Sequence, residues 1–250
     1  MEIKAIGILV GVSALFIGCA PASAPPGGSG GKGATAQAAD PSSLVAAGNE
    51  KSLFPFAQGN SWTFAVDIQR QLTGRPKEQS TSELEYRVLS VAKDGSFTKA
   101  TLGIFQDGKQ KDQQVWGADE HGIYQMAMNP PGGSLVLYSP KQPILHFPIK
   151  DQEEFSWNGS GVTPVGKPGK MEYKYKLDGT ADADTEMGSM HCVYMQTAGK
   201  FTNSDGTVGI LGVNSWYSPG VGLARYRQVI QIKGGESSVT LRLKKYTVKK

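Results

Sequence analysis

Residues 61–69, Ser-Trp-Thr-Phe-Ala-Val-Asp-Ile-Gln, alternate between large apolar side chains and small or polar ones. The apolar members are Trp62, Phe64, Val66 and Ile68. Successive side chains of a β-strand point to opposite faces, so this period of two predicts a strand with one face in a core and one in solvent. The stretch favours a β-fold, for which the rest of the chain must supply partner strands.

The same alternation recurs later in the chain, at Met171–Leu177 and again at Val239–Leu243. After Leu243 the apolar positions shift to Tyr246, which predicts a bulge at Lys244-Lys245. Residues 82–92 fit a helix as well as a strand, and we favour a strand because a turn signal follows directly.

Asp-Gly dipeptides separate several of these runs. Both residues tolerate positive φ, so Asp-Gly between alternating runs indicates a β-hairpin. They are Asp94-Gly95, Asp107-Gly108, Asp178-Gly179 and Asp205-Gly206. The chain is therefore expected to be all-β and mostly antiparallel.

The tryptophans suggest an internal repeat. Trp62 and Trp157 each follow a Phe-Pro pair, and Trp116 and Trp216 each precede a Gly-containing strand start. Two copies are too few for a solenoid, so the pattern predicts a curved sheet or partial barrel built from two pseudo-repeated halves, about residues 52–145 and 146–248. The alternative is that aromatic residues recur by chance where strands begin.

The N-terminus has the features of an export signal. The uncharged run 5–17 behind Lys4 is too short to span a membrane, which needs about 20 apolar residues. It predicts a signal peptide over residues 1–18. Residues 15–19, Leu-Phe-Ile-Gly-Cys, resemble a bacterial lipobox, and the resemblance implies that Cys19 is lipidated after cleavage. The alternative is secretion without a lipid, with cleavage after an Ala-x-Ala site such as residues 20–22.

Residues 19–51 are rich in Ala, Pro, Gly and Ser, which predicts a disordered tether. The tether would join the lipidated cysteine to a single β domain over residues 52–250.

Two motifs resemble those of a known group of proteins. The opening Phe-Pro-x-x-x-Gly-Asn-x-Trp at 54–62 and the later Trp-Tyr-x-Pro-Gly-Val-Gly at 216–222 are similar to motifs of uncharacterised bacterial envelope lipoproteins. More loosely, a β-rich lipoprotein of this size resembles the Lol-type lipoprotein carriers, whose curved sheet holds acyl chains. The resemblance implies a lipid-anchored envelope protein. Ala20 rather than Asp follows Cys19, which resembles the sorting signal of outer-membrane lipoproteins in enteric-type bacteria, so we expect the periplasmic side of the outer membrane rather than the inner membrane.

The sequence offers little for catalysis. Its three histidines, His121, His146 and His191, lie in no catalytic motif, and His191 and Cys192 are adjacent, so in a strand they point to opposite faces. We expect no enzyme activity, no metal and no cofactor. The net charge of +4 is far below that of nucleic-acid binders, so no nucleic-acid partner is expected. With Cys19 lipidated, Cys192 has no partner for an intrachain disulfide.

Two functions are compatible with these features. The first is a non-catalytic, lipid-anchored protein whose β domain serves as a scaffold or docks an envelope protein. The alternative is binding or carriage of a lipid or other hydrophobic ligand in a concave sheet rich in Met and Tyr, which line adaptable apolar pockets. The candidate ligand face consists of Met126, Met128, Tyr138, Tyr173, Tyr175, Met190 and Tyr194.

Overall fold

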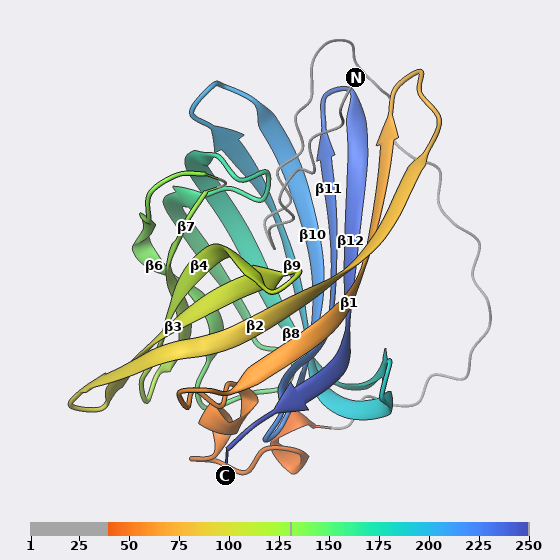
Figure 1. Cartoon of the computed structure of the whole chain (residues 1–250). Helices are drawn as coiled ribbons and strands as arrows, with labels where there is room; N and C mark the ends of the chain where they lie inside the picture. The colour runs from red at the N-terminus through yellow and green to blue at the C-terminus, as the bar shows by residue number, and fades with distance from the viewer. Residues whose placement is uncertain (1–39, 131, 250) are drawn as a thin grey trace.

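The computed structural model describes residues 40–130 and 132–249, which form one closed antiparallel β-barrel (Figure 1). Each strand pairs with its neighbours in sequence, and β1 pairs with β12 to close the barrel. The strands are β1 (Ser61–Leu72), β2 (Glu78–Asp94), β3 (Phe97–Gln106), β4 (Lys109–Ala118), β5 (Gly122–Met128), β6 (Val136–His146), β7 (Glu154–Val162), β8 (Pro168–Thr185), β9 (Gly188–Asn203), β10 (Val208–Ser218), β11 (Gly222–Ile232) and β12 (Gly235–Thr247). The all-β, antiparallel prediction is confirmed.

The alternating pattern of β1 places its apolar side chains inside the barrel. Trp62, Phe64, Val66 and Ile68 are all buried, whereas the residues between them are half-buried. Residues 82–92 are part of β2, as expected from the turn that follows them. A register shift leaves Lys244 as the extra residue of β12 opposite β1, which confirms the predicted bulge.

Three of the four Asp-Gly pairs join neighbouring strands, as predicted. The fourth prediction was wrong, because Asp178-Gly179 lies inside β8. There the register against β9 shifts between Leu177 and Thr180, and Gly179 adopts a φ of 74°. This Asp-Gly pair forms a bulge within a long strand, a conformation that also requires a residue tolerant of positive φ.

The barrel is closed rather than partial. β1 pairs with β12 along its whole length, from Ser61 opposite Thr247 to Leu72 opposite Gly235. Closure leaves no unpaired edge on either of these two strands. Pairing of the first and last strands depends on the twist accumulated by all strands between them, which no local sequence pattern reports.

The weakest junction of the barrel lies between β6 and β7, where Ser139 opposite Ser160 is the single paired position. Pro140 and Pro143 interrupt β6 and have no N–H to donate. Side chains bridge the junction instead: the Tyr138 hydroxyl donates to the Val162 carbonyl at 3.0 Å. The indole of Trp157 donates to the Pro140 carbonyl at 3.3 Å.

Two glycines of β7 make room for these aromatic rings. A Cβ at Gly161 would lie 2.3 Å from the Tyr138 ring, and one at Gly159 would lie 2.3 Å from the Trp157 ring. The rings therefore pack directly on the glycine backbone and cover the junction from inside.

The proposed repeat agrees with strand order but not with side-chain direction. Trp62 and Trp157 lie on β1 and β7, and Trp116 and Trp216 lie on β4 and β10, so each pair is six strands apart. Trp62 and Trp157 are both buried. Trp116 faces the inside of the barrel, whereas Trp216 packs outside against Tyr194 and Arg225. That the two halves arose by duplication stays a prediction.

The segment before β1 covers the lower end of the barrel (Figure 1). It contains two short 3-10 helices, η1 (Pro41–Ser43) and η2 (Glu50–Leu53). Val45 and Leu53 are buried in the main core, and the Gly220 N–H donates to the Ser52 carbonyl at 2.9 Å. Residues 40–51, expected to belong to the tether, are thus packed on the barrel, because these apolar side chains find a surface that composition does not reveal.

The signal peptide over residues 1–18, Cys19 and the tether up to residue 39 lie outside the described residues. Within the described residues, no helix has the length and apolar character needed to cross a membrane.

Candidate functional site: a cavity inside the barrel

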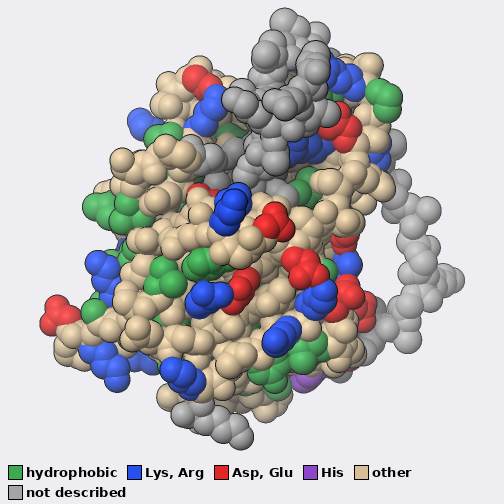
Figure 2. Space-filling view, viewed as in Figure 1, with side chains coloured by type: hydrophobic (Ala, Val, Ile, Leu, Met, Phe, Trp, Pro, Cys, Tyr) green, Lys and Arg blue, Asp and Glu red, His purple; other side chains and the backbone are tan. Residues whose placement is uncertain are grey.

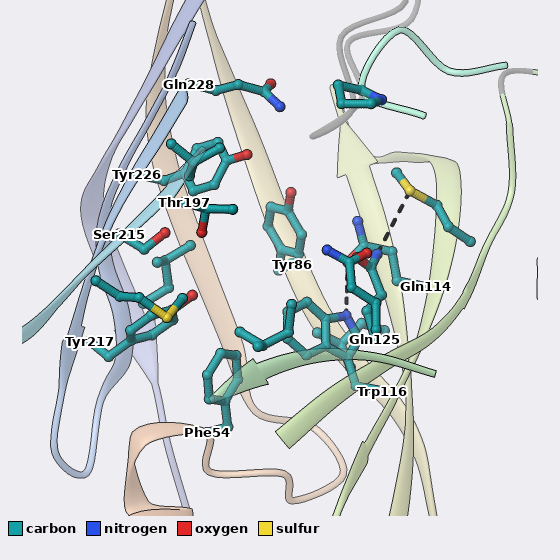
Figure 3. A pocket seen from close by; sticks show the side chains of 18 of the residues that line it. Phe54, Tyr86, Gln114, Trp116, Gln125, Thr197, Ser215, Tyr217, Tyr226 and Gln228 are labelled. Carbon is teal, nitrogen blue, oxygen red and sulfur yellow. Dashed lines mark hydrogen bonds between the residues drawn. The ribbon is translucent and has the colours of Figure 1, made fainter. Parts of the chain in front are cut away.

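The barrel encloses a cavity of about 170 Å³, which extends from Phe54 at its lower end to Gln228 at its upper end (Figure 3). Side chains from strands on all sides of the barrel line it, and most of them are aromatic or aliphatic. None of the lining residues within the described part of the chain is Lys, Arg, Asp, Glu or His. The cavity is thus an uncharged, largely apolar space.

Four residues of the predicted ligand face line this cavity: Met128, Tyr138, Tyr173 and Tyr175. The period of two on β8 brings Tyr173 and Tyr175 to the same face, together with Met171. The structure thus brings these four residues together on the inner surface of the barrel, and their contact with a ligand stays a prediction.

The other three predicted residues do not line the cavity. Tyr194 points outward, where its hydroxyl bonds Asn214 at 3.1 Å, and the neighbouring Met195 takes the inward position. Met126 lies next to Gly117, and Met190 packs near the buried Cys192. The strand register shifts next to Met126 and in β8 opposite β9. At these places the alternation of the sequence therefore does not give which side chains face inward.

Most of the lining was missed by sequence reasoning. The aromatic members not foreseen as ligand contacts are Phe54, Phe56, Trp62, Phe64, Tyr86, Trp116, Tyr217 and Tyr226. Strand parity alone could have indicated Trp62 and Phe64, which face the same side of β1 as the rest of its core residues. Phe54 and Phe56 enter from the segment before β1 and carry no such signal.

An aromatic cluster forms the lower end of the cavity (Figure 3). The Phe54 ring lies 5.0 Å from Trp116, 4.9 Å from Tyr217 and 5.8 Å from Phe56, measured between ring centroids. These distances are within the range of favourable aromatic pairs. The segment after η2 is thereby packed against β4 and β10, and its Phe54 and Phe56 rings line the cavity.

Several polar groups of the lining hydrogen-bond one another. The Trp116 indole donates to Gln114 Oε1 at 2.8 Å, and Gln142 Nε2 donates to the Tyr175 hydroxyl at 2.9 Å. The Tyr138 hydroxyl is likewise bonded, to the β7 backbone. Polar groups that are satisfied in this way do not oppose an apolar ligand.

The buried tyrosines stay neutral. Burial raises the pKa of Tyr217 to about 12, although a hydrogen bond with Ser215 lowers it in part. Burial likewise raises the pKa of Tyr138, Tyr175 and Tyr226 well above the ordinary value. The hydroxyls of the cavity are thus hydrogen-bonding groups without charge at neutral pH.

One carboxylic acid lies on the inward face of β4, two residues before Gln114. Asp112 is 5% exposed, and burial raises its pKa to about 6, with Lys111 opposing the shift. In an unfolded chain the pKa would be about 3.9. Because the pKa of Asp112 is higher in the folded than in the unfolded chain, its protonation contributes fully to stability below about pH 4. This contribution is lost as the pH rises through about 6.

Asp112→Asn is therefore expected to stabilise the protein by about 1–2 kcal/mol at pH 8, because the variant no longer buries a charge. At pH 4 the difference from the wild type should vanish. Urea unfolding at both pH values measures it, with Glu154→Gln at an exposed position of β7 as the control. An equal effect of Asp112→Asn at the two pH values would show that the buried charge is not the cause.

The histidines lie apart from the cavity. His121 is exposed at a turn, and His146 stacks on Phe155 with ring centroids 3.8 Å apart. His191 is exposed with its Nδ1 2.8 Å from Asp182, whereas Cys192 is buried, so the two adjacent side chains do point to opposite faces. Burial raises the pKa of the Cys192 thiol to about 12, which leaves it protonated and unreactive.

The acidic residues that follow the bulge of β8 each lie beside a basic group rather than together. Asp184 is 3.6 Å from Arg225, and Glu186 is 2.8 Å from Arg242. In the described part of the chain, no group of three or more His, Cys, Asp or Glu is placed to hold a metal ion.

No family model matches the chain, and no curated protein matches it. Two crystal structures are similar to it in fold. One is a "putative exported protein with YmcC-like fold" from Bacteroides fragilis, 14% identical, with 78% of this chain and 98% of that one covered and a TM-score of 0.44. The other is a "putative lipoprotein" from Parabacteroides distasonis, 16% identical with the same coverages and TM-score.

Proposed function

We propose that this protein is a lipid-anchored, non-catalytic envelope protein whose barrel binds one small, mostly apolar ligand. The observation that carries the proposal is the uncharged aromatic cavity inside the barrel. Of the two functions considered from the sequence, ligand binding is thus favoured over scaffolding.

The size of the cavity limits the ligand. An engineered apolar cavity of about 150 Å³ accepts benzene, so about 170 Å³ suits a molecule built on one ring or a short branched chain. Burial of the ligand's apolar surface contributes about 25 cal/mol of favourable free energy per Å². Only the part that exceeds the free-energy cost of association appears as affinity.

A docking function has weaker support. The most exposed large apolar side chains, Leu137 on β6 and Val208 and Ile210 on β10, are separated by β7, β8 and β9. Figure 2 shows hydrophobic side chains scattered among charged ones on the face in view. Scattered apolar residues are ordinary on protein surfaces, whereas docking sites form continuous patches.

Filling the cavity should abolish ligand binding. Leu211 lines the cavity on β10, and the neighbouring Ile210 is 54% exposed on the outside. Ethylbenzene at ten times its Kd should stabilise the wild type by about 1.4 kcal/mol, which raises the Tm by about 3–5 °C. Leu211→Trp should lose this ligand-induced shift, and Ile210→Trp, the matched control, should keep it.

The ligand-induced shift is compared within each variant, because overpacking alone can cost about 1–3 kcal/mol. If Leu211→Trp does not fold, as judged by circular dichroism, Val213→Phe at the next inward position of β10 replaces it. A full shift in a folded, cavity-filled variant would show that ethylbenzene binds elsewhere and that the proposal is wrong.

The anchor is proposed from the sequence of residues 1–19 alone. Cys19→Ser is expected to leave the protein folded but to move it from the detergent-rich to the aqueous phase in Triton X-114 partitioning, because one thioether-linked lipid group is lost. Cys192→Ala, which removes the chain's other cysteine, should partition like the wild type. Unchanged partitioning of Cys19→Ser would refute lipidation and, with it, the proposed lipid anchor.

A further inference from the structure

We propose that the ligand of the cavity is an uncharged molecule with a polar group that both donates and accepts hydrogen bonds, such as a primary amide or a hydroxyl, held by Gln228 and Tyr86. The inference rests on the proposed function and names the chemistry of the ligand at that same site.

Two fully buried polar atoms of the cavity lining have no hydrogen-bond partner within the described residues. The Tyr86 hydroxyl and the Gln228 amide oxygen are fully buried, yet neither forms a hydrogen bond within the described residues. Their residues are 8% and 4% exposed, and both line the cavity. A buried polar atom without a partner is costly, so such atoms in native proteins call for a ligand or a water.

The two groups come from different walls. Tyr86 projects from β2 and Gln228 from β11, and in Figure 3 both side chains lie above the aromatic lower end, with Tyr226 nearby. Tyr226 is close enough to Tyr86 to help raise its pKa. The two unpartnered polar atoms thus belong to residues that lie above the aromatic lower end of the cavity.

The other side-chain amides of the lining have partners. Gln114 is bonded to Trp116, Gln142 to Tyr175, and Gln125 lies 3.8 Å from the Met128 sulfur. Gln228 and Tyr86 are thus the lining residues of the described chain that hold a buried polar atom without a partner.

Gln228 and Tyr86 require different hydrogen-bond partners. The Gln228 oxygen accepts, so it needs a donor, and the Tyr86 hydroxyl, which stays protonated, can donate to an acceptor. Because no Lys, Arg or His among the described residues lines the cavity, an anionic ligand would leave its charge unpaired in an apolar space. The Asp112 carboxylate, which is near enough to Tyr86 to help raise its pKa, would also repel an anion. A fatty-acid carboxylate or a phosphate ester is thus disfavoured, and a neutral amide or alcohol is favoured.

Three compounds of similar shape test this on the full chain: benzamide, benzoate and ethylbenzene at pH 7.5, with affinities from ligand-observed NMR titration. We expect benzamide to bind at least tenfold more tightly than benzoate. Gln228→Leu and Tyr86→Phe should each lower the preference for benzamide over ethylbenzene about tenfold, as expected for the loss of one buried hydrogen bond. Tyr194→Phe, which removes an outward hydroxyl, is the matched control and should leave the preference unchanged.

The outcomes separate the two proposals. If none of the three compounds binds, the proposed function fails. If ethylbenzene binds but benzamide has no advantage over benzoate, or if both substitutions leave the preference for benzamide over ethylbenzene unchanged, the cavity binds apolar molecules and the inference about the polar group is overturned. If Gln228→Leu does not fold, Tyr86→Phe alone decides.

Discussion

Trp62→Ala is expected to lower the free energy of unfolding by about 3–5 kcal/mol, the range found when large aromatic core residues are truncated. Trp62 is 6% exposed at the start of β1, and its indole N–H donates to the Val221 carbonyl in the turn between β10 and β11. The side chain thus connects the first strand to a distant turn, and a Cβ at Gly222 would lie 3.4 Å from the indole nitrogen. Truncation removes packing and leaves a buried carbonyl without its donor.

Urea unfolding of the wild type and the variant measures this loss. Trp62→Phe keeps a smaller aromatic ring in the core while the indole N–H and its hydrogen bond are lost, and it should cost about 1–3 kcal/mol. A loss of less than about 1 kcal/mol in Trp62→Ala would contradict the buried position of the indole and its hydrogen bond to Val221.

Trp157→Ala should also lower the free energy of unfolding by about 3–5 kcal/mol, and here a weakened strand junction adds to the loss of core packing. Trp157 is 5% exposed and covers Gly159 at the junction of β6 and β7, where backbone pairing is limited to one position. Its indole donates to Pro140 across that junction, and its ring lies 6.2 Å from that of Tyr138. Without it, the junction loses one of the two side-chain hydrogen bonds that replace the missing ladder.

Trp216→Ala on β10 is the matched control for Trp157→Ala. Trp216 packs on the outside against Tyr194 and Arg225 and is only half-buried, so its truncation should cost about 1–2 kcal/mol. Hydrogen exchange followed by mass spectrometry should show faster exchange in β6 and β7 for Trp157→Ala alone. Equal losses for Trp157→Ala and Trp216→Ala would mean that the inside and outside positions of the two tryptophans do not differ as described.

Local sequence signals identified much of the strand content. The alternation in β1, the bulge at Lys244 and three Asp-Gly hairpins were all foreseen, because each depends only on neighbouring residues and on their φ preferences. The fourth pair, Asp178-Gly179, shows the limit of this reasoning, since a glycine with positive φ serves a bulge as well as a hairpin.

The cavity was foreseen only in part, for a different reason. The sequence indicates which residues are apolar but not which of two adjacent residues faces inward, so Tyr194 was chosen where Met195 lines the cavity. Closure of β1 on β12, the packing of Phe54 on Tyr217 and the unpartnered Gln228 depend on residues far apart in the chain. Such long-range contacts have no local signature.

The most direct test of a ligand-binding barrel is native mass spectrometry, with organic extraction, of the full-length protein purified in mild detergent. We predict that the wild type carries one small uncharged molecule at near-stoichiometric occupancy and that Leu211→Trp, with its cavity filled, carries none. A wild type that is empty, or a Leu211→Trp variant that retains the same molecule, would contradict binding inside the barrel.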